Sequence, residues 1–257
     1  MNFSRLTFAS FTRASGTTLL FTLTLCRQPY EDLNLEKEWG QEIYRRHIGS
    51  VRCSSDPSTD YFQKLTQKLL AQAEKIPYDF KFCVTENLEI NAYALPAGGV
   101  FIHRGLIRET RNEGELVFVV AHEISHIMLR HAFRMEKRRH QSDSFMARIK
   151  KYDALDAAQL TGVLGILSYS REFEKEADLK ALDLMQNAGI DPHDAENFME
   201  TLRRAEFIKP GIIGRMFSTH PSPQSRRVYI ARWINRNKTQ VGRTDSEEYR
   251  RLKKALP

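Results

Sequence analysis

The stretch from Glu115 to Arg134, ELVFVVAHEISHIMLRHAFR, predicts a single strongly apolar helix. Apolar residues occupy nearly every position around its axis, and a helix of this kind is buried inside a folded domain. The same stretch nevertheless carries His122, Glu123 and His126. Ionisable side chains are costly in apolar surroundings unless a partner compensates them. The sequence therefore predicts a central helix that carries a polar site.

The spacing of the two histidines favours a bound metal ion. Residues i and i+4 lie on the same face of a helix, so the imidazoles of His122 and His126 can reach one ion. Glu123 lies on the adjoining face, where its carboxylate can contact a water at the metal without being a ligand. The alternative is a chance match, with both histidines satisfied by hydrogen bonds in the core. We favour the metal because the rest of the helix is apolar.

A catalytic zinc ion takes three protein ligands and keeps one position for water, so a third ligand must come from elsewhere. The best candidate is SREFEKEAD, from Ser170 to Asp178. Glu174 and Asp178 share a helix face, so Glu174 can bind the ion while Asp178 accepts a hydrogen bond from the outer nitrogen of a ligand histidine. On another face of this helix, Glu176 and Lys180 are expected to form a surface ion pair. Taken alone, this acidic helix would be interpreted as a solvated surface.

The remaining sequence predicts mostly helix with one small sheet, an α+β arrangement. A single domain is expected over residues 31–240, preceded by a targeting segment (1–30) and followed by a basic tail (241–257). The expected helices are Glu31–Ser50, Tyr61–Ile76, Gly105–Thr110, Glu115–Arg134, Arg171–Asn187, Asp191–Phe207 and Pro223–Arg236, and the expected strands are Asp79–Thr85, Glu89–Leu95 and Val100–His103.

The first thirty residues have the pattern of an export signal. They contain three arginines and no acidic residue, and an apolar run, Thr17–Leu25, ends at Cys26. A basic region before a short apolar region is typical of a signal peptide. Cys26 also partly resembles a lipidated cysteine, although Leu25 stands where a small residue is expected. We expect a periplasmic or membrane-associated protein, or a cytoplasmic one if the upstream start codon is wrongly chosen.

The three cysteines leave two readings open. If Cys26 is removed or lipidated, Cys53 and Cys83 remain as a disulfide pair in an oxidising compartment. The alternative is three unrelated thiols, with Cys83 buried in a strand. None of the three has the spacing of a metal ligand.

The net charge of +7 comes mainly from two basic stretches, Arg134–Lys151 and Arg226–Lys254. Such stretches can attract the phosphates of nucleic acids or of lipid headgroups. We favour solvated basic faces, because neither stretch carries the interleaved aromatic residues of a nucleic-acid site. No nucleic-acid partner is expected, and association with a membrane surface is kept as an alternative.

The pairing of HEISH with SREFEKEAD resembles the gluzincin zinc peptidases, the family of the CAAX prenyl proteases, the heat-shock protease HtpX and the mitochondrial protease Oma. Asn91–Ile102 (NAYALPAGGVFI) resembles the strand and turn beside their cleft, and Ser218–Arg227 (STHPSPQSRR) resembles their later histidine loop. The resemblance runs from about Glu31 to Trp233. Because no stretch reaches 18 apolar residues, the chain is most similar to the soluble, often periplasmic, bacterial branch.

The resemblance implies a zincin-like peptidase domain with one Zn²⁺ per chain, and it suggests roles for two further groups of residues. His220 would be a reversible fourth ligand or a donor to the oxyanion; the alternative is an ordinary loop histidine before a proline. Asn91, Tyr93 and Leu95 would receive an extended substrate by β-augmentation; the alternative is an ordinary hairpin. His131 lies five residues after His126 and so is not on the helix face of the two ligand histidines. It is expected to have a structural role rather than to bind the metal.

The implied function is a zinc-dependent endopeptidase that hydrolyses unfolded or misassembled envelope proteins, with Glu123 as the general base. The main rival is a zinc-bearing chaperone or assembly factor with little proteolysis. Glu123 and Asp178 argue against that rival, since neither is needed simply to hold a metal, but a histidine on the fourth position would silence the zinc. An esterase or amidase, and a nucleic-acid-binding protein, are more distant alternatives.

Overall fold

A computed structural model describes residues 18–54, 58–139, 169–209, 211, 220, 223–237 and 245–255. Residues 1–17 of the expected targeting segment and the side chain of Cys26 lie outside this part, as does most of the basic stretch that begins at Arg134.

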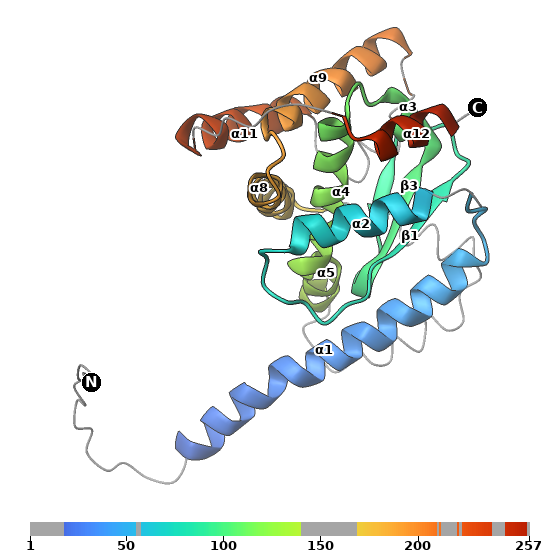
Figure 1. Cartoon of the computed structure of the whole chain (residues 1–257). Helices are drawn as coiled ribbons and strands as arrows, with labels where there is room; N and C mark the ends of the chain where they lie inside the picture. Colours follow the sequence, from blue (N-terminus) through green and yellow to red (C-terminus); the bar gives the residue numbers. More distant parts are fainter. Residues whose placement is uncertain are drawn as a thin grey trace, which may run out of the picture.

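The described residues form a mostly helical α+β domain, as predicted (Figure 1). The helices are α1 (Thr18–Ile48), α2 (Ser58–Leu70), α3 (Arg104–Glu109), α4 (Glu113–Met128), α5 (His131–Arg139), α8 (Arg171–Asn187), α9 (His193–Ile208), α11 (Pro223–Asn237) and α12 (Glu247–Ala255). The strands are β1 (Lys81–Thr85), β2 (Ala92–Ala94) and β3 (Gly99–His103), and a 3₁₀ turn, η1 (Pro96–Gly98), joins the last two.

The three strands form one sheet in the order β1-β3-β2. β3 pairs in parallel with β1 and antiparallel with β2, so β2 is an edge strand of the described sheet. β2 is shorter than the predicted strand, which was expected to begin at Glu89. The Asn87 side chain accepts a hydrogen bond from the Glu89 backbone N–H at 2.9 Å, and this local turn delays the start of the strand to Ala92.

Helix α4 runs through the centre of the molecule, between the sheet and α8 (Figure 1). Its first turn is capped by Asn112, whose side chain accepts a hydrogen bond from the Glu115 N–H. The prediction of a single helix to Arg134 is wrong, because α4 ends at Met128. Arg130 adopts a φ of 57°, which breaks a right-handed helix, and α5 leaves at an angle of 46°.

Taken singly, none of the helices in the described ranges is long and apolar enough to cross a membrane, whereas α4 and α5 pass that test as a bent pair.

The C-terminal segment contains a helix, α12, that the sequence analysis did not identify. Tyr249 on α12 is buried, and the Lys253 ammonium donates hydrogen bonds of 2.7–2.9 Å to the carbonyl oxygens of Ile107, Arg108 and Thr110. These carbonyls belong to the C-terminal end of α3, where helix carbonyls lack intrahelical partners. The expectation that Pro223–Arg236 is the last helix is therefore wrong, because α12 follows it.

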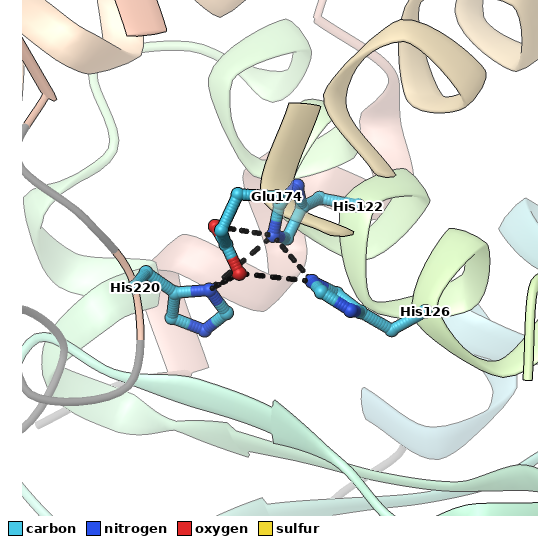
Figure 2. Close-up of side chains that lie close together, drawn as sticks. All are labelled: His122, His126, Glu174 and His220. Carbon is cyan, nitrogen blue, oxygen red and sulfur yellow. Dashed lines mark hydrogen bonds and ion pairs between the residues drawn. The ribbon is translucent and has the colours of Figure 1, made fainter. Parts of the chain in front are cut away.

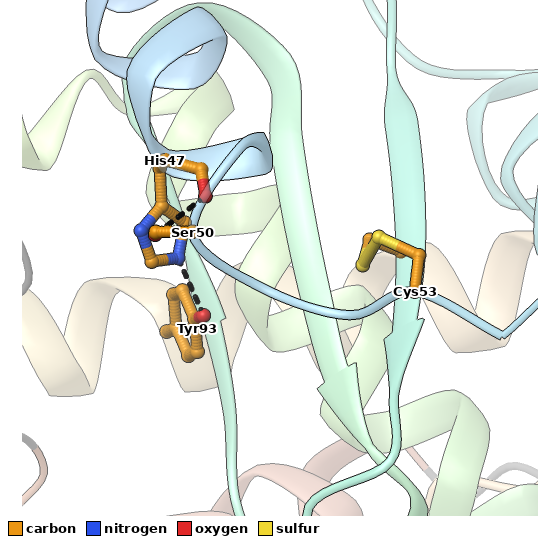
Figure 3. Close-up of a disulfide and its surroundings, with 5 residues drawn as sticks. His47, Ser50, Cys53 and Tyr93 are labelled. Carbon is orange, nitrogen blue, oxygen red and sulfur yellow. Dashed lines mark hydrogen bonds between the residues drawn. A yellow bond between two sulfur atoms is a disulfide. The ribbon is translucent and has the colours of Figure 1, made fainter. Parts of the chain in front are cut away.

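A disulfide joins Cys53 to Cys83, which confirms the pairing of these two cysteines (Figure 3). Cys53 follows α1 and Cys83 lies in β1, so the bond attaches the end of the long first helix to the sheet. The same region carries a second link, a hydrogen bond of 2.7 Å between His47 on α1 and the hydroxyl of Tyr93 on β2. Both contacts hold the C-terminal end of α1 beside the sheet.

Candidate metal centre

Three segments bring the predicted site residues together. α4 carries His122, Glu123 and His126, and α8, which packs closely on α4, carries Glu174. His220 arrives from the segment before α11 (Figure 2). All five side chains are buried, each less than 5% exposed.

The start of α8 aims Glu174 at α4. The Ser170 hydroxyl accepts a hydrogen bond from the Phe173 N–H at 3.2 Å and begins the helix one turn before the glutamate. Helical periodicity then places Glu174 and Asp178 on the face of α8 that is buried, while Glu172 stays exposed.

The distances within the cluster fit a four-coordinate ion (Figure 2). The Nε2 atoms of His122 and His126 are 2.9 Å apart, and they lie 3.6 and 3.4 Å from the carboxylate oxygens of Glu174. His220 Nδ1 is 2.8 Å from Glu174 and 3.4 Å from His122 Nε2. Ligands about 2.0–2.1 Å from a tetrahedral zinc ion are separated by about 3.3 Å, close to these values.

The chemistry of the donor atoms also fits a metal. His122, His126, Glu174 and His220 each offer a nitrogen or an oxygen, and these four atoms all lie within 4.8 Å of one another. Within the described structure, Glu174 Oε2 and Glu123 Oε2 are buried and accept no hydrogen bond. Two facing imidazole nitrogens and a buried carboxylate oxygen without a donor are costly unless a cation lies between them. The cluster can therefore hold a metal ion.

The surroundings of His122, His126 and Glu174 favour the protonation forms that bind metals. Removal from water lowers the pKa of both His122 and His126, so both imidazoles are neutral. Burial opposes ionisation of Glu174, but the imidazoles of His220 and His126 outweigh it and hold the pKa of that carboxyl well below its ordinary value. Neutral imidazoles and an ionised carboxylate are the ligand forms that a divalent cation requires.

Asp178 lies behind His122, with its Oδ1 atom 2.8 Å from His122 Nδ1. Sequence reasoning missed the two side chains that hold this carboxylate. Arg226 donates to both oxygens of Asp178, at 2.5 and 2.8 Å, and the hydroxyl of Tyr229 donates to Oδ2 at 2.6 Å. Burial raises the pKa of Asp178, but Arg226 and His122 outweigh it, so the carboxyl is ionised.

Arg226 was assigned to a solvated basic stretch, and that assignment is wrong for this residue, which is 3% exposed. The signal that could have found it was its position six residues after His220, within the stretch that resembles the histidine loop.

His126 has partners of its own. Its Nδ1 atom is 2.9 Å from Nδ1 of His131, and the ring of Tyr169 stacks on it with a centroid distance of 4.0 Å.

The predicted pair of Glu176 with Lys180 is not formed. Glu176 instead binds His131 and Arg134 at 3.1 and 2.7 Å, because the break after α4 turns α5 toward α8.

The backbone of the predicted substrate strand is engaged on one side. The Asn91 carbonyl oxygen accepts from the His103 N–H, and the Leu95 N–H donates to Gly99 O. Hydrogen-bonded pairs alternate along an antiparallel ladder, so the backbone groups of Asn91, Tyr93 and Leu95 all face β3. Those of Ala92 and Ala94 face away from β3, and both residues are buried, 2% and 7% exposed.

An ion site built from two helix-borne histidines, the glutamate between them and a carboxylate on a second helix has the arrangement of HExxH metallopeptidases.

The comparisons with known proteins agree with this class. The model of peptidase family M48 matches residues 58–234, and the chain belongs to that family. The family membership confirms the resemblance seen in the sequence.

Among relatives, the beta-barrel assembly-enhancing protease of Escherichia coli (strain K12) is 31% identical over 232 residues, covering 83% of this chain and 47% of the relative. The mitochondrial metalloendopeptidase OMA1 of Schizosaccharomyces pombe is 28% identical over 242 residues, covering 87% of this chain and 68% of the relative. The chain thus spans about half the length of the first of these proteins.

Proposed function

We propose that this chain is a zinc-dependent endopeptidase that cleaves unfolded or misassembled proteins of the cell envelope. The observation that carries the proposal is the buried cluster of His122, His126 and Glu174 beside the carboxylate of Glu123. Membership of peptidase family M48 supports the reaction class, and a relative named as a metalloendopeptidase supports cleavage within a chain.

The proposed ligands of one zinc ion are His122, His126 and Glu174. When bound, zinc lowers the pKa of a water molecule toward neutrality and polarises the scissile carbonyl. Glu123 accepts the proton of the attacking water and then transfers it to the leaving amine. Burial raises the pKa of Glu123, which brings this carboxyl closer to the pH at which it must both take and return a proton. Asp178 holds the ring of His122.

His220 is proposed to occupy the fourth position reversibly and to keep the centre closed. Its Nδ1 atom lies among the ligand atoms, 2.8 Å from Glu174, and its Nε2 atom lies 3.7 Å from Glu123 Oε1. Displacement of this ring would open the position that a water needs. The same contact supports the second candidate function, a zinc-bearing assembly factor in which the site stays closed.

The edge strand β2 is proposed to bind an extended segment of substrate. The support comes from its position at the edge of the described sheet and from the backbone groups of Ala92 and Ala94, which face away from β3. Both alanines are buried, so a substrate strand could pair here only after their cover moves. Asn91, Tyr93 and Leu95 would contribute side chains and strand geometry rather than backbone hydrogen bonds to the substrate.

The proposed location is the periplasm or the outer face of a membrane. The Cys53–Cys83 disulfide supports an oxidising compartment. Exposed basic residues on α12, such as Arg250 and Arg251, support contact with anionic lipid headgroups. No nucleic-acid partner is proposed.

Glu123→Gln is the direct test of the peptidase proposal. The amide cannot accept the proton of water but occupies the same space, so we expect zinc to be retained and cleavage of casein to fall by at least about 100-fold. Cleavage would be followed by electrophoresis, with bound zinc measured by atomic emission and a chelator as the second control. If wild type and variant both bind zinc and cut casein equally well, the assigned base is wrong.

His220→Ala tests whether the centre is held closed. Removal of the ring opens the fourth position, so we expect faster cleavage of casein at unchanged zinc content. A large loss of activity would instead indicate that His220 stabilises the oxyanion. If wild type and His220→Ala both bind zinc and neither cuts, the assembly-factor function is favoured.

A further inference from the structure

We propose that His131 is a positioning residue for the metal centre, which fixes the ring of His126 through a hydrogen-bonded chain that ends on Glu176 and Arg134. This inference rests on the proposed role of His126 as a metal ligand. It gives a specific role to His131, which was expected to be structural rather than metal-binding.

The contacts form a continuous path from the centre to the surface. Nδ1 of His126 is 2.9 Å from Nδ1 of His131, and Nε2 of His131 is 3.1 Å from Oε2 of Glu176. Arg134 donates to the same carboxylate oxygen at 2.7 Å. His131 is fully buried, whereas the Glu176 side chain is 34% exposed.

The geometry assigns the proton on each ring. Nε2 of His126 faces His122 and Glu174, so this nitrogen must be free to bind the ion. A neutral imidazole that binds through Nε2 carries its proton on Nδ1. That N–H can donate only if Nδ1 of His131 is unprotonated, and the proton of His131 then lies on Nε2, where it is donated to Glu176.

The two proposed histidine ligands are thus supported in different ways. His122 is held directly by the Asp178 carboxylate, whose charge is balanced by the buried Arg226. His126 is held by a neutral ring, which stacks on Phe173 with a centroid distance of 4.5 Å. A carboxylate in the place of His131 would add a further buried anion to those of Asp178 and Glu174. The imidazole instead passes the hydrogen bond on to a carboxylate that reaches solvent.

The outer hydrogen bond of a ligand histidine fixes its tautomer and its ring direction, and its loss weakens metal affinity by about 10–100-fold. Zinc affinity is therefore the proper measurement. Asn and Leu have nearly the same shape, but only Asn carries an oxygen that can accept the N–H of His126. They form a matched pair at position 131.

The experiment measures zinc affinity of the full chain by competition with a chromophoric chelator, together with the visible absorption spectrum of the cobalt-substituted protein. We expect His131→Leu to bind zinc about 10–100-fold more weakly than wild type and to alter the cobalt spectrum. We expect His131→Asn to keep most of the affinity and the wild-type spectrum. A purely structural role predicts the opposite order, because Leu suits an apolar interior better than Asn.

A second pair of variants serves if the substitutions at His131 prevent folding. Glu176→Ala removes the end of the chain of hydrogen bonds. Glu172→Ala removes a carboxylate about one helical turn away, whose ion pair with Arg138, at 3.9 Å, is exposed. We expect weaker zinc binding for Glu176→Ala and unchanged binding for Glu172→Ala.

The outcomes separate this inference from the proposed function. If wild type binds zinc but His131→Leu binds it as tightly as His131→Asn, or the two variants at 176 and 172 behave alike, the positioning role is overturned and the metal site stands. If wild type itself binds no zinc, the proposed function fails, and this inference fails with it.

Discussion

Arg226 illustrates how one buried cation supports the metal centre without touching the expected ion. Its guanidinium binds both oxygens of Asp178, and Asp178 in turn holds His122. An arginine is suited to this task because its planar fork matches a carboxylate, whereas a lysine offers a point charge. The position of the ring of His122 therefore depends on a residue from a different helix, α11.

We predict that Arg226→Met destabilises the protein by about 3–5 kcal/mol, because it removes the cationic partner of the buried Asp178 carboxylate and leaves only its contacts with His122 and Tyr229. Urea unfolding followed by circular dichroism would measure the loss. Arg227→Met is the matched control, since the neighbouring side chain is half-exposed and its contact with Glu200, at 3.7 Å, is weak. Equal unfolding midpoints for the two variants would contradict the assigned role.

At the scale of single residues, the sequence predicted the candidates that lie on local motifs. His122 and His126 share a helix turn, and Glu174 and Asp178 share another, so helical periodicity relates each pair. Arg226, Tyr229 and His131 could not be assigned in this way, because their partners lie on other helices. Their roles depend on how α4, α5, α8 and α11 pack.

At the scale of elements, the break between α4 and α5 decides what surrounds the site. Apolar residues occur on both sides of Arg130, up to Leu129 and again at Ala132 and Phe133, so the sequence predicted one helix through this point. Arg130 has a left-handed conformation, and its side chain forms an ion pair with the buried Glu36 on α1. Glu36 also accepts a hydrogen bond from Tyr78 at 2.8 Å. A local pattern cannot reveal an interruption that is stabilised from another helix.

α1 also positions the turn that follows the edge strand. At Gly40, α1 lies so close to η1 that an added Cβ atom would be 2.6 Å from the Cβ of Ala97 and still closer to the Pro96 carbonyl oxygen. Trp39 and Ile43 are buried on either side of this glycine. The close approach holds η1, and with it the end of β2, against the long helix.

We predict that Gly40→Ala destabilises the protein by about 1–3 kcal/mol, because α1 and η1 must move apart. Differential scanning calorimetry would measure the change. Gly49→Ala is the control, since a Cβ there would make only an ordinary contact, 3.6 Å from the Arg46 carbonyl oxygen. If Gly40→Ala melts no lower than Gly49→Ala, the close contact does not limit stability. If the protein cleaves casein, a higher KM for Gly40→Ala than for wild type would indicate that the position of η1 affects substrate binding at β2.

At the scale of the whole molecule, two links attach the segment after α1 and the segment before α12 to the rest of the domain. The disulfide closes a separation of 30 residues between the end of α1 and the sheet. At the other end, the Ser246 backbone N–H and hydroxyl both bind the carboxylate of Glu113, in the first turn of α4. The segment after α1 is thus attached to the sheet, and the segment before α12 is attached to the helix that carries His122, Glu123 and His126.

We predict that the double variant Cys53→Ser, Cys83→Ser loses about 3–4 kcal/mol of unfolding free energy, because a cross-link over 30 residues restricts the unfolded chain. Urea unfolding of wild type with and without reductant would measure the effect, and reduced wild type should match the variant. Cys26→Ser is the control and should leave the midpoint unchanged. If reductant leaves the urea midpoint of wild type unchanged, the disulfide does not contribute to stability.

The sequence alone determined the α+β class, the central apolar helix and the two motifs of the candidate site. These features rest on patterns within single segments. A fully buried helix is apolar all round and a half-buried helix has one apolar face, so either kind of burial is visible in the residues of one segment. Tertiary structure decided between a disulfide and free thiols, broke the central helix at Arg130 and folded α12 onto α3.

Tertiary structure also brought Arg226 and His131 behind the two histidines. Such contacts join residues far apart in the sequence, and they form because a buried charge or a buried N–H must find a partner wherever packing provides one.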